Sequence, residues 1–156
     1  MNAKVNINYP SIRMASEGDL AMIEHVVHSA YQDYIPRIGR PPAPMTDDYR
    51  PHVAAGNVWV LVLDSKVVGL IVLLPKANYM LLDNVAVAPE KQGRGFGSRL
   101  MYFAEVRTRQ CGLKEIQLYT NELMRENIAF YKNLGYQETD RRLDSGFKRV
   151  FMKKAL

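Results

Sequence analysis

Residues 92–98 read Gln92-Gly93-Arg94-Gly95-Phe96-Gly97-Ser98 and lie between a strand pattern and a helix pattern. Glycines let the backbone take positive φ angles and come close to a ligand. The free N–H groups at the start of the following helix, together with the helix dipole, attract phosphate. Arg94 and Arg99 add positive charge beside this turn. The stretch therefore predicts an anion-binding turn, with a plain left-handed turn and tight strand–helix packing as the alternative.

Two other phosphate-binding motifs do not fit this stretch. A P-loop ends in Gly-Lys-Ser/Thr, and the sequence contains no such ending. A dinucleotide-binding turn needs G-x-G-x-x-G and an acidic residue after the next strand. Here the third glycine comes one residue early, at Gly97, and Tyr119-Thr120-Asn121 stands where the acidic residue belongs. We therefore do not expect NAD or ATP as the ligand.

Hydrophobic periodicity on both sides of the turn predicts alternating strands and helices. Strands are expected at residues 12–14, 58–63, 67–74, 79–88, 116–120, 136–141 and 147–153, and helices at 20–34, 46–55, from the glycine turn to Gly112, and at 127–134. We expect Ser16, Thr46 and Asn127 to cap three of these helices. This order predicts an α/β (α+β) fold in a single domain over residues 1–156, with a mixed, largely antiparallel twisted sheet flanked by helices.

The composition fits one globular domain, with 47% hydrophobic and 24% charged residues in a chain of 156. The longest apolar run, residues 67–74, is far too short to span a membrane, and the first twenty residues lack a secretory apolar stretch. We therefore expect no membrane partner and a cytoplasmic location. Cys111 is the one cysteine, so a cysteine metal cluster is excluded, and we expect it to be buried. His25 and His28 lack a clear third ligand, so no metal site is expected.

The formal net charge of +5 favours an anionic partner without naming one. Basic residues gather near the C-terminus, where only Asp144 opposes them: Arg141, Arg142, Lys148, Arg149, Lys153 and Lys154. A nucleic-acid-binding surface is one interpretation of this cluster, but a solvated hairpin at the edge of the sheet is more ordinary. We therefore expect no nucleic-acid partner.

Two motifs in this order resemble one known superfamily. The first is Leu82-Asp83-Asn84-Val85-Ala86-Val87-Ala88-Pro89 followed by Gln92-x-x-Gly95-x-Gly97. It is similar to the acyl-CoA signature of the GCN5-related N-acetyltransferase (GNAT) superfamily. The second, Asn127-Ile128-Ala129-Phe130-Tyr131-Lys132-Asn133-Leu134-Gly135-Tyr136, resembles a downstream stretch of the same superfamily, as does the expected order of elements. The resemblance implies a GNAT-like fold and direct transfer of an acetyl group from acetyl-CoA (coenzyme A) to an amine.

The resemblance also implies roles for the matching residues. Backbone groups of Val85, Ala86 and Val87 would bind the pantetheine arm, and one amide would polarise the thioester carbonyl. Asn127 would contact the cofactor arm, and Tyr131 would protonate the leaving thiolate. Without the resemblance, Tyr131 is more simply a core aromatic residue. The residues that would cradle the pyrophosphate with backbone groups are Gln92, Gly93, Arg94, Gly95, Phe96, Gly97 and Ser98.

The general base and the acceptor stay open at this point. Family members carry a carboxylate at positions that match Tyr119 or Leu81, where this chain has none. Asp83 is a candidate that could equally form an ion pair at a strand end, and a water chain or a neutral amine would also serve. A non-catalytic acyl-CoA-binding or regulatory module on the same fold is the alternative function.

The resemblance implies that the proline-rich segment at residues 36–51 forms one wall of the acceptor site, with an ordinary surface connection as the alternative. It holds five of the eight prolines, which reduce its conformational freedom. Tyr34 and Arg37 are the expected acceptor contacts, because a guanidinium suits a carboxylate or a phosphate. The acceptor would be a small-molecule amine or a protein amine. A homodimer is compatible with the sequence, which does not fix the oligomeric state.

Overall fold

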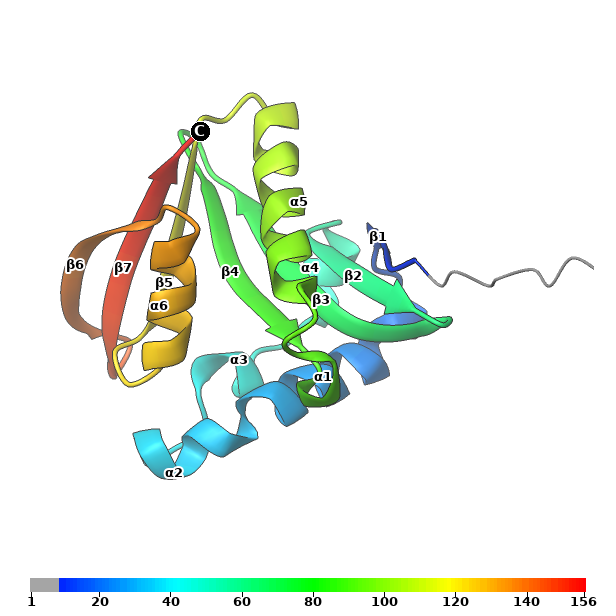
Figure 1. Cartoon of the computed structure of the whole chain (residues 1–156), viewed down its shortest axis with the longest axis horizontal. Coiled ribbons are helices and arrows are strands. Elements are labelled where there is room, and N and C mark those ends of the chain that lie inside the picture. The colour runs from blue at the N-terminus through cyan, green and yellow to red at the C-terminus, as the bar shows by residue number, and fades with distance from the viewer. Residues whose placement is uncertain (1–8) are drawn as a thin grey trace, which may run out of the picture.

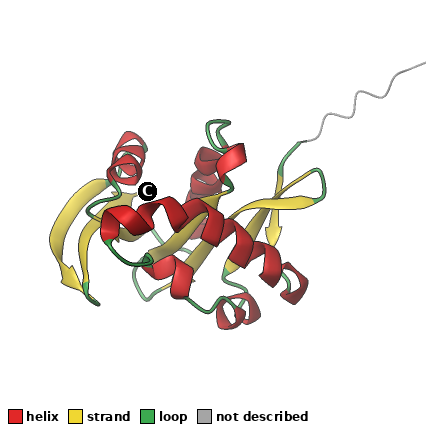
Figure 2. Cartoon of the chain, turned by 90° about the horizontal axis from the view of Figure 1, so that it is seen from below, coloured by secondary structure: helices red, strands yellow, loops and turns green. Residues whose placement is uncertain are grey.

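Seven strands form one sheet in the order β1-β2-β3-β4-β5-β7-β6, with helices on both of its faces (Figures 1 and 2). The structure, a computed structural model, describes residues 9–156. The strands are β1 (Ser11–Met14), β2 (Val58–Leu63), β3 (Lys66–Pro75), β4 (Met80–Val87), β5 (Glu115–Asn121), β6 (Gln137–Asp144) and β7 (Phe147–Ala155). Neighbouring strands run antiparallel except for the parallel pair β4 and β5, so the expected mixed, largely antiparallel fold is confirmed.

The helices divide between the two faces. They are α1 (Leu20–Tyr31), α2 (Ile35–Ile38), α3 (Ala43–Thr46), α4 (Arg50–Ala54), α5 (Phe96–Gln110) and α6 (Arg125–Asn133), with short 3₁₀ turns at Glu17–Asp19, Gln32–Tyr34 and Pro89–Lys91. Ile71 packs with Leu100 in the core under α5, whereas its neighbour Leu70 packs with Val26 under α1. Because successive side chains of a strand point to opposite faces, β3 is apolar on both sides and lies at the centre of the molecule.

β4 opens a wedge in the sheet. It pairs with β5 only through its first three residues, and beyond them the two strands diverge (Figure 1). Its register with β3 shifts at the same point, since Val72 is opposite Asn84 and Leu73 is opposite Leu82. Asp83 is therefore an extra residue without a partner on β3, a β-bulge of the kind that redirects side chains beside functional sites. The wedge leaves one edge of β4 without a neighbouring strand.

Two expected helix caps are wrong. Thr46 ends α3 instead of capping the next helix, and α4 begins behind Tyr49. Both helices have a proline near their start, and this explains their boundaries. Proline lacks an N–H group, and the first turn of a helix is where that group is not needed for a bond within the helix. Asn127 lies inside α6, whose N-cap is Met124. The Asn121 side chain accepts the N–H of Leu123 at 2.9 Å and so fixes the turn before this helix.

The C-terminal hairpin forms the edge of the sheet, as the hairpin interpretation predicts. β6 is the outermost strand, and Ser145 and Gly146 form the turn with φ angles of 50° and 79°. Five of the basic side chains noted above are ion-paired: Arg141 with Glu138, Arg142 with Asp140, Arg149 with Asp144, Lys153 with Glu115 and Lys154 with Glu105. Pairing of this kind reduces the positive field that a nucleic-acid surface needs.

The two remaining expectations are the burial of Cys111 and the lack of a membrane-spanning segment. Cys111 is exposed, so its expected burial is wrong; it follows the last turn of α5, just before Gly112 turns the chain with a φ of 74°. Among residues 9–156, no helix combines the length and the apolar character needed to cross a membrane.

Candidate active site

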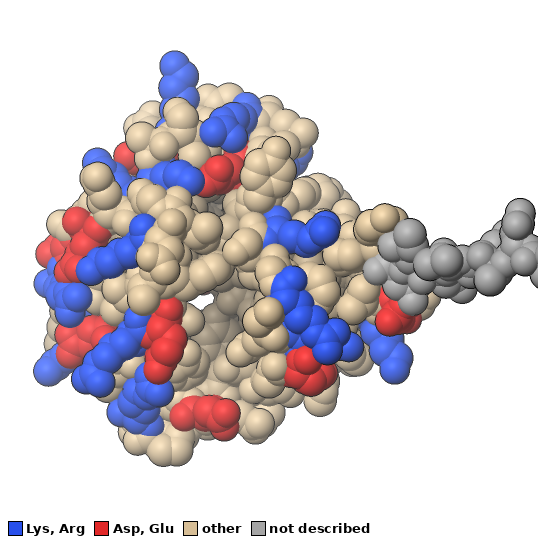
Figure 3. Space-filling view, viewed as in Figure 1, with Lys and Arg blue, Asp and Glu red and all other residues tan. Residues whose placement is uncertain are grey.

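Three connected cavities follow the wedge beside β4. The large groove, of about 680 Å³, lies between β4, the start of α5 and α6. The side cavity, of about 410 Å³, lies between the β4 bulge, Tyr119 and the α3–α4 segment. A narrow passage shares Val85 and Tyr131 with the large groove and Asp83 and Asn84 with the side cavity. Figure 3 shows the hollow at the middle of this face of the molecule.

The edge of β4 lines the large groove with backbone groups. The Val85 carbonyl accepts a hydrogen bond from the Tyr31 hydroxyl at 3.1 Å, and the Val87 carbonyl accepts one from the Gln92 amide at 3.0 Å. The Ala86 carbonyl faces β3 instead, because backbone groups of a strand alternate between its two edges. The structure therefore turns the backbone of Val85 and Val87 toward the groove, whereas the backbone of Ala86 pairs with β3.

The glycine turn brings the start of α5 to the groove. Gly93 and Gly95 have φ angles of 77° and 82°, and a Cβ at either position would meet no atom within 4 Å. The first N–H with an acceptor inside α5 is that of Arg99, bonded to the Gly95 carbonyl at 3.1 Å. The N–H groups of residues 96–98 are thus left without an acceptor in the helix. Six of the seven expected cradle residues line the groove; Arg94 is exposed and lies off its wall.

α6 supplies the two expected side chains on one face. Asn127 and Tyr131 are four residues apart, and both line the large groove and the passage. Tyr131 is 7% exposed, and burial raises the pKa of its hydroxyl well above the ordinary value. This hydroxyl forms no hydrogen bond with the described residues. It is therefore a protonated donor, free for a ligand, at the point where the groove meets the passage.

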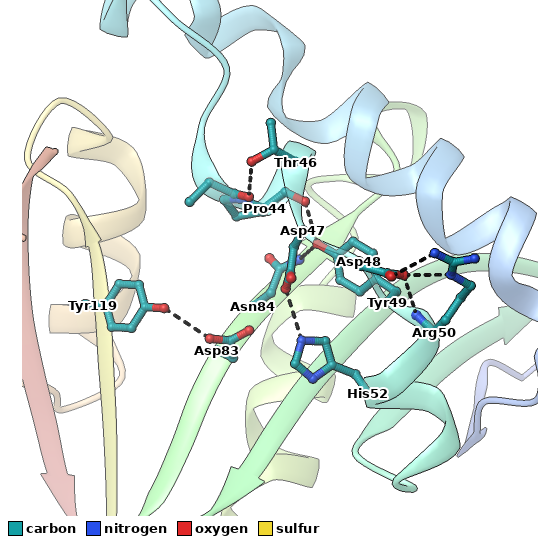
Figure 4. Close-up of polar contacts among 11 residues, drawn as sticks. Pro44, Thr46, Asp47, Asp48, Tyr49, Arg50, His52, Asp83, Asn84 and Tyr119 are labelled. Carbon is teal, nitrogen blue, oxygen red and sulfur yellow. Dashed lines mark hydrogen bonds and ion pairs between the residues drawn. The ribbon is translucent and has the colours of Figure 1, made fainter. Parts of the chain in front are cut away.

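A buried hydrogen-bond network supports the wall opposite. The Tyr31 hydroxyl donates to the Asn84 carbonyl oxygen at 2.6 Å, and the Asn84 amide donates to the Tyr49 hydroxyl at 3.0 Å. Tyr49 in turn donates to the Pro44 carbonyl at 2.7 Å (Figure 4). These bonds join α1, β4 and the α3–α4 segment. They hold the bulge of β4 at the junction of the passage and the side cavity.

The side cavity gathers acidic and imidazole groups from separate elements. The Tyr119 hydroxyl donates to Asp83 at 3.1 Å, and burial together with Asp83 raises the pKa of Tyr119 to about 12. Nε2 of His52 lies 3.1 Å from Oδ2 of Asp47. Ligand atoms of Asp47, His52 and Asp83 all lie within 4.8 Å of one another (Figure 4). Asp83 therefore faces this pair and Tyr119, and no described lysine or arginine forms an ion pair with it.

The expected acceptor contacts lie on the large groove. Tyr34 and Arg37 line it, and neither lines the side cavity. Arg37 donates to Glu126 at 2.8 Å and to the Leu123 carbonyl at 3.0 Å, and its guanidinium lies 5.1 Å from the Tyr34 ring centre. Arg37 therefore ties α2 to the start of α6 at the mouth of the groove.

Sequence reasoning missed most of the side cavity. Asp47 and His52 belong to no motif, and only the concentration of prolines around residues 36–51 drew attention to this segment. Asn84 lies within the first motif but was not singled out, although a buried amide needs hydrogen-bond partners. Tyr119 stands out in the sequence only as a residue at a position where a carboxylate would be expected.

Comparison with known families identifies the class of protein. Residues 54–138 match the acetyltransferase (GNAT) domain family. Because this match covers more than half of the chain, the chain belongs to the GNAT acetyltransferase family, as the two motifs predicted.

Curated relatives match about half of the chain. N-alpha-acetyltransferase 80 of Mus musculus is 34% identical over 90 residues, which cover 52% of this chain and 27% of that protein. The uncharacterized N-acetyltransferase YjgM of Escherichia coli (strain K12) is 28% identical over 86 residues, covering 53% of this chain and 52% of that protein. The chain thus spans about a quarter and about half of the length of these two relatives.

Solved structures share the whole fold. The PaiA N-acetyltransferase of Thermoplasma acidophilum, in complex with coenzyme A, superposes with a TM-score of 0.80 at 20% identity, over 95% of this chain and 99% of that chain. Arabidopsis thaliana Naa50, in complex with the bisubstrate analogue CoA-Ac-MVNAL, gives a TM-score of 0.75 at 19% identity, over 94% of this chain and 99% of that chain. Both likenesses concern the fold.

Proposed function

We propose that this chain is an acetyl-CoA-dependent N-acetyltransferase that transfers the acetyl group directly to an amine. The observation that carries the proposal is the position of Tyr131, whose free hydroxyl lies where the large groove meets the passage. A thioester in the groove and an amine from the side cavity would meet beside this hydroxyl. Family membership and coenzyme A in a structure of the same fold support the proposal.

The large groove fits coenzyme A in size and in chemistry. The free N–H groups of residues 96–98 and the dipole of α5 suit the pyrophosphate. The edge of β4 at Val85 and Val87 offers backbone groups to the pantetheine arm, and one N–H there would polarise the thioester carbonyl. Gln92, Gly93, Gly95 and the start of α5 would form the pyrophosphate cradle, with Asn127 against the cofactor arm. Bound acetyl-CoA would supply the acetyl group as a thioester.

Tyr131 would act as a hydrogen-bond donor to the departing sulfur. A thiol has an ordinary pKa of about 8.5, and a thiolate is therefore a fair leaving group. Burial raises the pKa of Tyr131 and keeps its hydroxyl protonated through the neutral range. Complete transfer of its proton to the thiolate is uphill, so the stabilisation begins as a charge-assisted hydrogen bond. Solvent in the open groove would then complete the protonation.

The acceptor class that the comparisons support is an amine. A curated relative is named as an N-alpha-acetyltransferase, and Naa50 binds an analogue that joins coenzyme A to a peptide. A small-molecule amine and a protein amine both remain candidates. A single N-acetyltransferase domain over residues 1–156, a cytoplasmic location, the lack of a nucleic-acid partner and a homodimer stay predictions from the sequence.

The test is a panel of amines with acetyl-CoA, with release of thiol as the readout. The panel contains alkylamines, amino acids, a lysine peptide and peptides with free N-termini, and calorimetry measures acetyl-CoA binding in parallel. Amine-dependent thiol release with formation of the acetylated amine supports the proposal. Tight binding of acetyl-CoA without turnover on any amine would overturn it in favour of the non-catalytic module.

A further inference from the structure

We propose that Asp47, His52 and Asp83 bind the ammonium group of a cationic acceptor and that His52 takes its proton. The inference rests on the proposed function and names the acceptor class and the proton acceptor of that same site. Asp47 lies between α3 and α4, His52 lies on α4, and Asp83 is the bulged residue of β4. The fold alone brings these three residues together, since they form no sequence motif.

The spacing of the three groups suits an ammonium nitrogen. Three atoms that are no more than 4.8 Å apart always share a point within about 2.8 Å of each, which is the length of a charge-assisted N–H···O bond. An alkylammonium has three N–H donors, and the two carboxylates and Nε2 of His52, in the tautomer with its proton on Nδ1, provide three acceptors; Nε2–H donates to Asp47 only after it has taken the proton. Figure 4 shows the three side chains directed toward one another around this space.

The charge of the side cavity selects a cation. Asp47 and Asp83 are its two carboxylates, and none of its described lining residues is a lysine or an arginine. Arg149, which lines the adjoining passage, bonds to Asp144 at 2.9 Å and lies 4.3 Å from the Tyr119 ring centre. A short acceptor that carries a carboxylate as well as its amine would place like charges together near the two aspartates. We therefore expect alkylamines and lysine-like side chains to be better acceptors than free amino acids.

His52 and Asp47 are arranged to accept a proton. The ammonium R–NH₃⁺ gives one proton to the imidazole, which leaves R–NH₂ with a free electron pair and forms an imidazolium. The two carboxylates on either side stabilise this imidazolium, as a carboxylate does for the histidine of other acid–base pairs. The side chain of His52 is 22% exposed, so the proton reaches solvent from the ring. The neutral amine then enters the passage, which Asp83 and Tyr131 both line.

Other titratable groups surround the imidazole. Tyr49 lies with its ring centre 6.3 Å from that of His52, and Tyr119 faces Asp83 across the cavity. Asp48 lies nearby but is bonded to Arg50 at 3.0 Å and does not line the cavity. Asp48 is therefore a matched control for Asp47, because it carries the same charge on the same segment.

The first experiment compares n-butylamine with 4-aminobutanoate as acceptors, using thiol release at saturating acetyl-CoA. We expect the amine without a carboxylate to have a kcat/KM at least about tenfold higher, which corresponds to about 1.4 kcal/mol. Equal values, or a preference for 4-aminobutanoate, would overturn the assignment of a cationic acceptor. Loss of activity on removal of divalent metal, restored by zinc alone, would show instead that the three residues hold a metal ion.

The second experiment measures the pH profile of His52→Gln with n-butylamine. We expect kcat/KM at pH 7 to fall about a hundredfold, the usual scale for acid–base help, and the loss to shrink as pH rises and free amine becomes abundant. Acetyl-CoA affinity should stay within twofold, Asp47→Asn and Asp83→Asn should show the same trend, and Asp48→Asn should match the wild type. A His52→Gln profile parallel to the wild type would overturn this inference alone. No turnover of any amine by the wild type would overturn the proposed function as well.

Discussion

The large groove and the side cavity, which both adjoin β4, are built by different means. One wall of the large groove is made of backbone: the free edge of β4, a turn with two glycines at positive φ, and the unpaired N–H groups at the start of α5. The side cavity is made of side chains that come from α4, the α3–α4 connection, the β4 bulge and β5. A backbone-built site needs particular residue types at fixed spacing, and it therefore leaves a motif. A site built from side chains on distant segments leaves none.

The largest expected effect tests the point where the large groove meets the passage to the side cavity. Tyr131→Phe keeps the ring and removes only the hydroxyl, so we expect kcat to fall about a hundredfold or more. The free energy of unfolding should change by less than about 1.5 kcal/mol, since no cavity opens. Acetyl-CoA affinity should hardly move, and the defect should shrink at higher pH if thiolate leaves more easily unprotonated. Steady-state rates, calorimetry and thermal unfolding of this one variant provide the three measurements.

Tyr136→Phe is the matched control for this variant. The Tyr136 ring packs edge-on against Tyr131 with their centres 6.0 Å apart, and its buried hydroxyl has no hydrogen-bond partner among the described residues. Its removal should leave kcat unchanged and should not lower stability. A kcat for Tyr131→Phe within twofold of the wild type, with chemistry shown to be rate-limiting, would make Tyr131 a core residue and favour the non-catalytic module.

A second effect tests how far the side cavity depends on its side-chain network. Tyr49→Phe removes the hydroxyl that accepts from the Asn84 amide and donates to the Pro44 carbonyl. The buried amide loses its partner, so we expect a loss of about 2 kcal/mol in the free energy of unfolding and a Tm lower by roughly 4–8 °C. Acetyl-CoA affinity should be retained, because neither Tyr49 nor Asn84 lines the large groove.

Tyr102→Phe is the control for Tyr49→Phe, because it shows whether removing any tyrosine hydroxyl lowers Tm. Tyr102 is 69% exposed on α5, and its substitution should leave Tm within about 1 °C. Equal Tm values for the Tyr49 and Tyr102 variants would mean that water replaces the lost hydroxyl and that the network does not hold the bulge.

Much of the fold could be predicted from the sequence because it depends on local signals. The pattern of apolar residues located β2, β3 and β4 to within one residue at each end. The two failed caps have separate physical reasons. Proline near the start of a helix competes with Thr46 for the boundary of α4, and the Asn121 turn starts α6 before Asn127.

The sites could be predicted only in part. The glycines at 93 and 95 predict the groove, because their positive φ angles give the turn that leaves the start of α5 open. The bulge at Asp83 has no sequence signal, because it arises from the register between β3 and β4. The approach of His52 to Asp83 depends in turn on how the proline-rich segment packs beneath β4. Long-range packing of this kind is not encoded in the spacing of any short stretch.

A third effect tests the glycine turn, which belongs to the backbone wall of the large groove. Gly95→Asp places a carboxylate at the N-cap of α5, where we expect the pyrophosphate, so acetyl-CoA affinity should fall at least tenfold, or about 1.4 kcal/mol. Gly112→Asp is its control at the other end of the helix, because it has a φ of 74° and equally open surroundings. Both variants should lose stability from the left-handed backbone, and Gly112→Asp should lose at least as much, because its carboxylate lies at the negative end of the helix dipole. Calorimetry that gives the same acetyl-CoA affinity for both folded variants would remove the pyrophosphate from this turn.

The smallest effect concerns Arg37, which the sequence places at the acceptor and the structure places at the mouth of the large groove. For an acceptor that carries an anionic group away from its amine, Arg37→Ala should raise KM about threefold, since exposed charged contacts are worth up to about 1 kcal/mol, and it should spare acetyl-CoA affinity. Glu126→Ala distinguishes two causes, because Arg37 and Glu126 form one ion pair at 2.8 Å. If Arg37 contacts the acceptor directly, only its own substitution raises KM. If the pair merely holds α2 against α6, both substitutions raise KM equally. An acceptor KM that neither substitution changes would remove this arginine from the acceptor site and leave the side cavity as the acceptor's entrance.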